Sequence, residues 1–249
     1  MAGGKGTRLR PYTATFPKPL VPVGDRPILE ILLRQLAAAG IDHAVIAVNH
    51  LRHIIEAFFG DGRRFGLGVS YVTEDRPLGT AGPIGNAIDR LGEHFVVANG
   101  DLLTTLDFRA MIKAHRTSGA AATVGSFPRE ERSDFGILEV DDAMRMVGYR
   151  EKPTHTHLVS MGLYVLSREA VRPHVAPDTP LDMPDLLRAL VSSGREVRCH
   201  RADGLWLDIG RPEDYAAAQK LREENPALFD ERPADRPVAR DGDVRPTVT

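Results

Sequence analysis

The sequence predicts an α/β protein built on a doubly wound, mostly parallel sheet. Two observations favour this class. Short apolar runs, typical of strands buried on both faces, alternate with amphipathic helical segments through the first half of the chain. A length of 249 residues, of which 42% are hydrophobic, is sufficient for one large domain with a full core.

The first half of the chain supplies the alternating elements. The predicted strands are residues 44–48, 69–73 and 95–98, and the predicted helices are residues 28–39, 51–59, 80–91 and 108–117. Pro27 stands near the first position of the first helix, and Gly40 ends it. Strands and helices that alternate in this way form sheets with crossover helices on both faces.

The pattern changes after Ala120. Short strands are expected at residues 121–125, 136–140, 144–149 and 160–166, with a hairpin turn at residues 141–143. We therefore expect a small antiparallel part inserted into the domain. A helix at residues 184–193, extended segments at 196–200 and 205–207, and a helix at 212–221 complete the prediction.

Composition sets the expected domain boundary. From residue 230 onward the chain is rich in Pro, Arg and Asp and has almost no apolar side chains to bury. We expect residues 1–229 to form the folded domain and residues 230–249 to be a disordered tail.

Charge and cysteine content narrow the class of partner. The formal net charge of −2 gives no overall basic field, so we expect no nucleic-acid partner. No apolar run approaches the roughly 20 residues of a membrane span, so no membrane partner is expected. The single cysteine, Cys199, excludes an internal disulfide and suits a reducing cytoplasm. A homo-oligomer is left open.

The most informative segment is a glycine-rich run near the N-terminus, Gly-Gly-Lys-Gly-Thr-Arg-Leu-Arg-Pro at residues 3–11. Convergent backbone N–H groups in such a run form an anion-binding nest, to which Arg8 and Lys18 add positive charge for a polyphosphate. The run is not a Walker A loop, because no Gly-Lys-Ser/Thr closes it. It is not a dinucleotide fingerprint, because Leu9 stands at the third glycine position. The alternative interpretation is a surface turn with solvated charges.

Two aspartates are candidate metal ligands. Asp101 follows a buried apolar strand at its C-terminal end, which is the edge where open α/β sheets bind ligands. A carboxylate there suits Mg²⁺, although a helix N-cap or a turn would also use an aspartate. Asp208 lies within the apolar stretch Trp-Leu-Asp-Ile-Gly. A buried lone carboxylate is costly, so Asp208 is expected to need a partner or a metal.

Four further candidates are two charged residues and two glycines. Glu151 and Lys152 offer an acceptor and a point cation, although exposed Glu-Lys pairs are commonly solvated. Gly136 and Gly162 allow close approach of the backbone to a ligand, or are ordinary strand glycines.

Gly79 and Thr80 stand at a turn before a helix, where backbone groups can contact a base edge, although Thr80 could equally be an N-cap. The His-Thr-His run at residues 155–157 is expected to be a surface loop and not a metal site.

The run at residues 3–23 resembles the signature of the sugar-phosphate nucleotidyltransferases, also called nucleotide-sugar pyrophosphorylases. Later segments resemble motifs of this family in the same order, and the resemblance covers residues 1–221. These segments are residues 77–82 (Pro-Leu-Gly-Thr-Ala-Gly), 99–101 (Asn-Gly-Asp), 151–153 (Glu-Lys-Pro) and 206–210 (Trp-Leu-Asp-Ile-Gly).

The resemblance implies a Rossmann-like nucleotidyltransferase fold and a reaction. A nucleoside triphosphate and a sugar 1-phosphate would give a nucleotide-sugar and pyrophosphate. In similar enzymes the two aspartates hold the catalytic Mg²⁺ together, which implies this role for Asp101 and Asp208. Arg8 and Lys18 would stabilise the leaving pyrophosphate. The nucleotide-binding residues implied are Gly3, Gly4, Gly6, Thr7, Gly79 and Thr80.

The resemblance also implies that the antiparallel part binds the sugar. Glu151 would accept from the sugar, Lys152 would orient its phosphate as a catalytic residue, and Gly136 and Gly162 would let the backbone approach the sugar.

The sequence of residues 78–82, with Glu74 shortly before it, is most similar to that of mannose-1-phosphate guanylyltransferases. This favours GTP with mannose 1-phosphate or a related manno sugar. A dTTP- or UTP-dependent glucose-1-phosphate nucleotidyltransferase and a non-catalytic nucleotide-sugar-binding regulatory protein are the alternatives.

One departure from the family concerns the N-terminus. Members begin with a short apolar strand that runs into the glycine loop, and Met1 stands where that strand should end. The expectation is that the first central strand of the sheet is missing.

Overall fold

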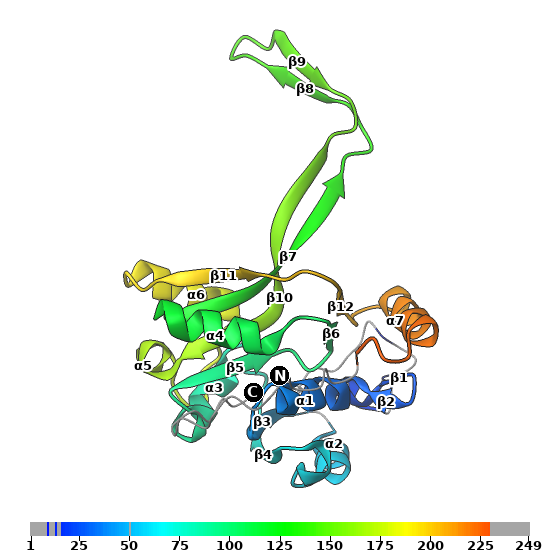
Figure 1. The fold of residues 1–249 in the computed structure, drawn as a ribbon. Helices are drawn as coiled ribbons and strands as arrows, with labels where there is room; N and C mark the ends of the chain where they lie inside the picture. Colours follow the sequence, from blue (N-terminus) through cyan, green and yellow to red (C-terminus); the bar gives the residue numbers. More distant parts are fainter. Residues whose placement is uncertain (1–8, 10–12, 14–15, 50, 230–249) are drawn as a thin grey trace.

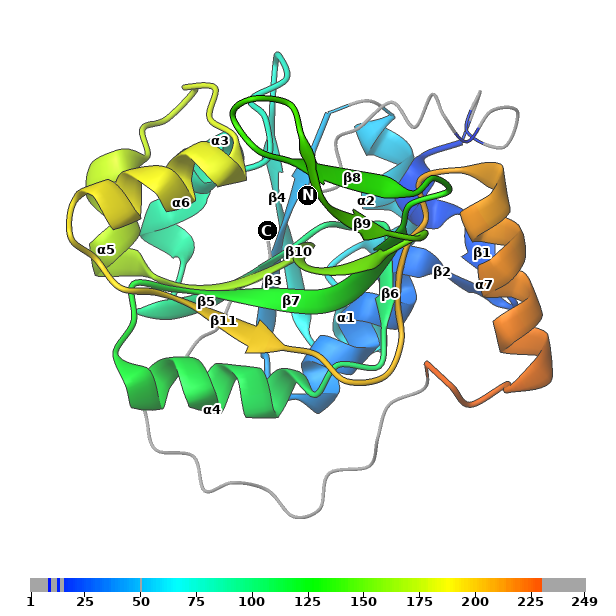
Figure 2. The same cartoon turned by 90° about the horizontal axis from the view of Figure 1, so that it is seen from above.

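The protein consists of a body of helices and strands from which a long two-stranded arm projects (Figure 1). The computed structural model describes residues 9, 13, 16–49 and 51–229. The glycine loop at residues 3–8 and the tail at residues 230–249 lie outside the described residues. Figure 2, turned by 90°, looks down the arm onto the body.

The strands of the body form two main ladders. Strands β3 (His43–Val48) and β4 (Gly68–Thr73) are parallel. A second ladder has the order β11-β7-β10-β5. Its strands are β5 (His94–Ala98), β7 (Ala122–Arg132), β10 (Thr154–Ser167) and β11 (Val197–Arg201). In the second ladder β5, β7 and β11 run in one direction and β10 runs antiparallel to its two neighbours, so the described sheet is mixed, with parallel strands in the majority.

The two ladders belong to one layer, although no hydrogen bond joins β3 to β5 among the residues that the structure describes. Alternate side chains of both strands enter the same two core clusters. Ile46 and Val96 lie in one cluster, and Val45 and Val97 lie in the other. That arrangement is what two neighbouring segments of a single sheet produce, since successive side chains point to opposite faces. The missing first strand stays a prediction.

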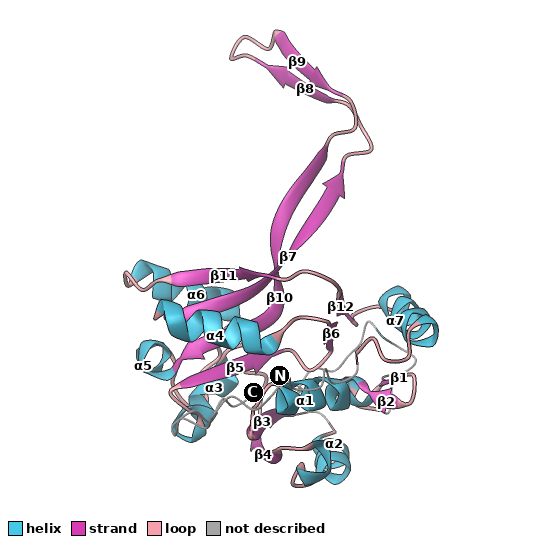
Figure 3. Ribbon diagram, viewed as in Figure 1, coloured by secondary structure: helices cyan, strands magenta, loops and turns pink. Residues whose placement is uncertain are grey.

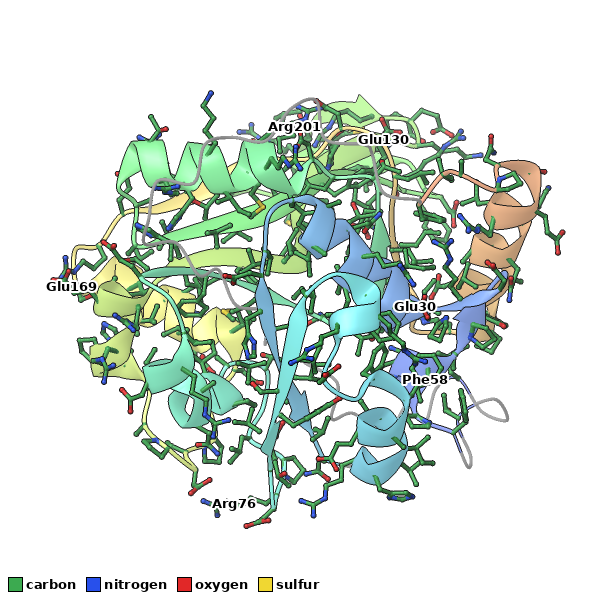
Figure 4. All side chains as sticks on the ribbon, turned by 60° about the horizontal axis from the view of Figure 1, so that its bottom comes forward. Glu30, Phe58, Arg76, Glu130, Glu169 and Arg201 are labelled. Atoms are coloured by element: carbon green, nitrogen blue, oxygen red, sulfur yellow. The ribbon has the colours of Figure 1, made fainter. Side chains whose placement is uncertain are left out.

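Helices cover both faces of this layer, as the alternation of elements predicts (Figure 2). On one face lie α1 (Ile28–Ala38), α2 (Arg52–Phe59) and α4 (Phe108–Ser118). On the other lie α3 (Gly82–Ala87), α5 (Arg168–Val171) and α6 (Met183–Ser192). Charged side chains surround the body, as Arg76 and Glu169 illustrate (Figure 4). No helix in the described part of the chain is both long and apolar enough to cross a membrane.

The arm comprises residues 127–159 and is the largest departure from the predicted elements. Strands β7 and β10 continue far beyond the predicted residues 121–125 and 160–166, in one uninterrupted register from Ser126↔Ser160 to Arg132↔Thr154. At its end stands the predicted hairpin, β8 (Ile137–Val140) and β9 (Met146–Arg150) (Figure 3). The His-Thr-His run at residues 155–157 is therefore part of a strand, and the expected surface loop is wrong. These polar segments lack the alternation of apolar residues that predicts a strand, and backbone hydrogen bonds between β7 and β10 order them instead.

A third cluster joins the last helix to the start of the chain. Helix α7 (Pro212–Glu224) buries Ala218 against a cluster that also contains Ile28 of α1. Phe229 is 2% exposed in this cluster, and its carbonyl accepts a hydrogen bond from Gln35 Nε2 at 3.2 Å. Three short elements complete the region: 3₁₀ helix η2 (Lys18–Leu20), β1 (Pro22–Val23) and β2 (Arg26–Pro27).

Phe229→Ala should lower the free energy of unfolding by roughly 3–5 kcal/mol, because it removes a buried aromatic ring and leaves a cavity. Val191→Ala is the control, since Val191 is 59% exposed; it should change the free energy by less than about 0.5 kcal/mol. Urea denaturation measures both. Equal values for the two variants would contradict the packing described for Phe229.

A pair of histidines, of which His115 is buried and His94 partly exposed, links α4 to the sheet. His115 is 0% exposed, and its Nδ1 lies 2.9 Å from Thr123 Oγ1. Its Nε2 lies 3.2 Å from His94 Nδ1. Burial lowers the pKa of His115 to about 4, with His94 adding to the effect. The unfolded chain therefore takes up this proton at a higher pH than the folded chain does.

The free energy of unfolding should fall as the pH drops from about 6.5 to about 4, by on the order of 3 kcal/mol for His115. His115→Asn should flatten this part of the pH profile. His53→Gln, at an exposed position on α2, should leave the profile unchanged. Equal profiles for wild type and His115→Asn would contradict a neutral buried His115.

Candidate active site

Asp101 lies at the C-terminal end of a buried strand, as predicted. Strand β5 leads into a turn at residues 99–101, and β6 (Leu102–Thr104) follows directly. The backbone of the turn is held on both sides. Asn99 donates its N–H to Gly162 O at 2.9 Å, and Asp101 O accepts from Ile209 N at 3.1 Å.

Asp208 reaches the same place from the far end of the chain. Strand β12 (Trp206–Asp208) pairs antiparallel with β6, and Asp208 stands opposite Leu102, the neighbour of Asp101. One short ladder therefore places the backbones of the two candidate metal ligands at neighbouring positions. Asp208 is exposed, so the expectation of a buried carboxylate is wrong. A strand end at the surface accounts for this, since its apolar neighbour Ile209 turns into the core instead.

Lys18 pairs with Asp101 across 83 positions of sequence. The Lys18 ammonium contacts Asp101 Oδ2, and the two side chains are only 12% and 22% exposed. An opposite charge offsets the desolvation of a partly buried carboxylate. The contact fixes the start of η2 against the strand end that carries Asp101.

Gly162 supports the same turn from below. Its φ of 74° lies in the left-handed region, and a Cβ there would clash with the Asn99 side-chain amide. Glycine is therefore required for β10 to approach the turn that leads to Asp101. The close approach at Gly162 is to Asn99, and the predicted approach of its backbone to a sugar stays a prediction.

Gly79 and Thr80 lie at a tight turn between β4 and α3. Gly79 has a φ of 77°, and a Cβ would stand 2.7 Å from Leu181 O. Thr80 donates its N–H to Asp182 Oδ1 at 3.0 Å, and Thr80 Oγ1 accepts from Met183 N at 2.8 Å. The Thr80 N–H and hydroxyl thus tie two loops together, and contact with a nucleotide stays a prediction.

Glu74 braces the start of this turn. It is 8% exposed, and its Oε2 accepts from Leu78 N at 3.0 Å. Burial raises the pKa of the Glu74 carboxyl, while the hydrogen bond from Leu78 acts in the opposite direction.

Three of the four candidates for the sugar and its phosphate, Gly136, Glu151 and Lys152, lie together at the joint between the two ladders of the arm. Tyr149 donates its hydroxyl to Glu151 Oε2 at 2.6 Å, and a Cβ at Gly136 would clash with that hydroxyl. The hydrogen bond to Glu151 raises the pKa of Tyr149. Lys152 has a φ of 42°, a backbone conformation that residues other than glycine seldom adopt.

Seven of the described candidate residues form two groups, and Gly79 and Thr80, at the turn between β4 and α3, belong to neither. Lys18, Asp101 and Asp208 meet at one edge of the body, with Gly162 beneath them. Gly136, Glu151 and Lys152 meet on the projecting arm (Figure 1). Arg8 and the four residues Gly3, Gly4, Gly6 and Thr7 lie outside the described part of the chain.

Sequence reasoning missed two residues that hold candidates in place, Asp182 beside Thr80 and Tyr149 beside Glu151. Asp182 directly precedes Met-Pro at the start of a helix, and this pattern could have indicated an aspartate with a structural role. Tyr149 stands two residues before Glu151, and the alternation of a strand would have placed both side chains on one face.

Comparison with known proteins identifies the family. The profile described as nucleotidyl transferase matches residues 1–225, so this chain belongs to the nucleotidyl transferase family.

Three curated relatives differ in their nucleotide. A UTP–glucose-1-phosphate uridylyltransferase of Synechocystis is 34% identical over 86% of this chain and 60% of its own length. A mannose-1-phosphate guanylyltransferase of Mycobacterium tuberculosis is 34% identical over 86% of this chain and 61% of its own. A glucose-1-phosphate thymidylyltransferase of Streptomyces griseus is 36% identical over 89% and 64%. The chain thus spans less than two thirds of each relative.

Among solved structures, HddC from Yersinia pseudotuberculosis is similar with a TM-score of 0.69 and 25% identity, over 88% of this chain and 96% of that one. A second crystal structure of HddC is a complex with GMP-PN.

The Lys18–Asp101 contact can be tested with a double-mutant cycle of Lys18→Met and Asp101→Asn. Because both side chains are mostly buried, the coupling energy should exceed the roughly 0.2–1 kcal/mol of exposed pairs. The exposed pair Arg188–Asp185 is the control and should fall within that range. Additive effects of the two substitutions, within about 0.5 kcal/mol, would contradict the pairing.

Proposed function

We propose that this chain transfers a nucleotidyl group from a nucleoside triphosphate to a sugar 1-phosphate. The observation that carries this proposal is the convergence of Lys18, Asp101 and Asp208 at one sheet edge in a member of the nucleotidyl transferase family. The products are a nucleotide-sugar and pyrophosphate. The proposed location of the reaction is the cytoplasm.

In the proposed reaction an oxygen of the sugar phosphate attacks the α-phosphorus. A new P–O bond forms, and the bond from the α-phosphorus to the bridging oxygen of pyrophosphate breaks. The attacking phosphate is already ionised, so no residue has to remove a proton. Lys18, together with Arg8 and the backbone of Gly3, Gly4, Gly6 and Thr7, stabilises charge on the departing pyrophosphate.

Asp101 and Asp208 fit a Mg²⁺ ion. Mg²⁺ is typically bound by one or two carboxylates together with substrate phosphates. The β6–β12 ladder brings the backbone of Asp208 next to that of Asp101, which directly precedes β6. The metal would neutralise charge on the α-phosphate. The contact with Lys18 holds the Asp101 carboxylate in position at this edge.

For the substrates, we propose GTP and mannose 1-phosphate or a related manno sugar. The guanylyltransferase relative and the complex of HddC with GMP-PN support guanine as the base of the nucleotide. The sequence of residues 78–82, which follows Glu74, supports it as well. We assign Gly79 and Thr80 to the nucleotide. The uridylyl- and thymidylyltransferase relatives, at similar identity, support UTP or dTTP with glucose 1-phosphate as the second candidate.

The substrates are tested by pyrophosphate release with each of GTP, UTP, dTTP and ATP against mannose 1-phosphate and glucose 1-phosphate, with Mg²⁺. The highest kcat/KM should be for GTP with mannose 1-phosphate. A preference for UTP or dTTP with glucose 1-phosphate would select the second candidate. Nucleotide-sugar binding without turnover of any pair would indicate a regulatory protein instead.

Asp208→Asn should lower kcat by about 100-fold or more, as loss of one electrostatic stabiliser does, while the melting temperature stays close to that of the wild type. Asp203→Asn is the matched control, since Asp203 is an exposed aspartate five positions earlier, and it should keep wild-type turnover. Near wild-type turnover of Asp208→Asn would exclude the proposed carboxylate pair.

A further inference from the structure

Asp182 stands where the loop before α6 meets the turn at residues 78–82. It directly precedes α6, a position at which an aspartate normally accepts a hydrogen bond from the backbone of its own helix. Its carboxylate makes no such bond. Asp182 Oδ1 accepts instead from Thr80 N at 3.0 Å and from Thr80 Oγ1 at 3.2 Å. The carboxylate therefore serves a turn that lies 102 positions earlier in the chain.

Further hydrogen bonds hold the same two segments together. Leu181 O accepts from Ala81 N at 2.8 Å, and Leu181 N donates to Leu78 O at 2.9 Å. Thr80 Oγ1 accepts from Met183 N at 2.8 Å. The segment that leads into α6 thus contacts the turn near its beginning, at its centre and near its end.

A second clamp joins the two segments before and after the turn. Asn86 Nδ2 donates to Asp178 Oδ1 at 2.9 Å, and Asn86 Oδ1 accepts from Asp178 N at 2.7 Å. Arg76, which is labelled in Figure 4, donates to Asp178 O at 3.0 Å. The clamp fixes the flanks of the turn, and Asp182 supplies the carboxylate that reaches its centre.

Asp182 is carried by an element that is anchored in the core. Met183, Leu186 and Leu190 of α6 are buried, in the cluster that also contains Ile84 of α3. Figure 2 shows the two helices at one end of the body. A side chain on a packed, rigid element has a well-defined position, and so have the groups that are hydrogen-bonded to it.

The turn presents backbone groups to a ligand. Gly79 and Thr80 are exposed, between two buried side chains. The Thr80 N–H and hydroxyl are taken up by Asp182 and Met183. In the part of the chain that the structure describes, no hydrogen bond uses the Gly79 N–H or the carbonyls of Gly79 and Thr80. One donor and two acceptors are thus left at this surface, and these are the groups that pair with the edge of a nucleobase.

We propose that Asp182 is a positioning residue for the nucleobase. The inference rests on the proposed function, which assigns Gly79 and Thr80 to the nucleotide. By fixing the Thr80 N–H and hydroxyl, the Asp182 carboxylate sets the direction in which the Gly79 N–H and the two carbonyls point. Asp182 acts through Thr80 and not on the base itself. A turn held in this way binds more tightly, because it loses less conformational freedom on binding.

The proposed role concerns one of the two substrates. The residues proposed for the sugar phosphate, Glu151 and Lys152, belong to the arm, and those proposed for the metal lie at the β6–β12 ladder. Loss of Asp182 should therefore weaken binding of the nucleoside triphosphate and raise its KM. The KM for the sugar 1-phosphate and kcat should stay unchanged, as for any residue that contributes only to uniform binding.

Two substitutions of Asp182 test the proposal by calorimetry without sugar phosphate. GTP, UTP and dTTP are each measured with the wild type and Mg²⁺, and the one that binds most tightly is used. Asp182→Ala removes the acceptor and should raise the dissociation constant about 10-fold, as loss of a hydrogen bond to a charged group does. Asp182→Asn keeps an oxygen acceptor and should stay within about threefold of the wild type, since a neutral acceptor makes a weaker bond.

Asp185→Ala is the matched control. Asp185 is an exposed aspartate in the first turn of the same helix, and it pairs with Arg188 at 2.8 Å. This variant should leave the dissociation constant unchanged. Thr80→Val removes the hydroxyl partner of Asp182 and should raise the constant. Combined with Asp182→Ala it should add little, because both substitutions remove parts of one interaction. Fully additive effects of the two would contradict the proposed coupling.

Hydrogen exchange of the Thr80 amide gives a readout that needs no nucleotide. Asp182→Ala should accelerate this exchange, and Asp185→Ala should not. An unchanged exchange rate, or a lowered melting temperature of Asp182→Ala with an unchanged dissociation constant, would overturn the proposal, since the latter shows a role in stability alone.

The outcomes also separate this proposal from the proposed function. A wild type that binds the nucleoside triphosphate but gives no turnover would count against the proposed function only, because the dissociation constants still decide the role of Asp182. A wild type that binds none of the three nucleoside triphosphates would overturn both.

Discussion

The ion pair between Lys18 and Asp101 is the interaction on which the geometry of this site depends. A carboxylate with only 22% of its side chain exposed is costly to keep charged without a cation nearby. Lys18 supplies that cation from a segment 83 residues earlier and thereby fixes the start of the described chain against the sheet edge. The same two side chains are those to which the proposed reaction assigns phosphate and metal.

A single short ladder makes the rest of the edge. By pairing β12 with β6, the chain brings Asp208 next to Asp101 and holds the turn through the bond from Ile209 N to Asp101 O. Gly162 lets β10 approach that turn, and Trp206 fixes the adjacent Met161. The root of the arm and the two carboxylates therefore share one set of contacts, which links the direction of the arm to the site.

The sequence predicted the buried strands β3, β4 and β5 well, because runs of Val, Ile and Ala are an adequate signal for strands covered on both faces. It failed for the outer halves of β7 and β10, whose polar residues are ordered by backbone pairing and give no alternation. It named Lys18 and Asp101 as site residues but not their contact, which depends on the path of the chain. Burial of Asp208 was wrongly inferred from its apolar neighbours, since a strand end can turn one side chain outward and the next inward.

In this account, catalysis consists of positioning and charge stabilisation, and the nucleotidyl group passes directly from pyrophosphate to the sugar phosphate. The stereochemistry at the α-phosphorus tests this most directly. With a single diastereomer of an α-thio nucleoside triphosphate, one direct displacement should give a nucleotide-sugar with inverted configuration at that phosphorus. Retention of configuration would require two displacements and a covalent nucleotidyl-enzyme, and would contradict the roles given to Lys18, Asp101 and Asp208.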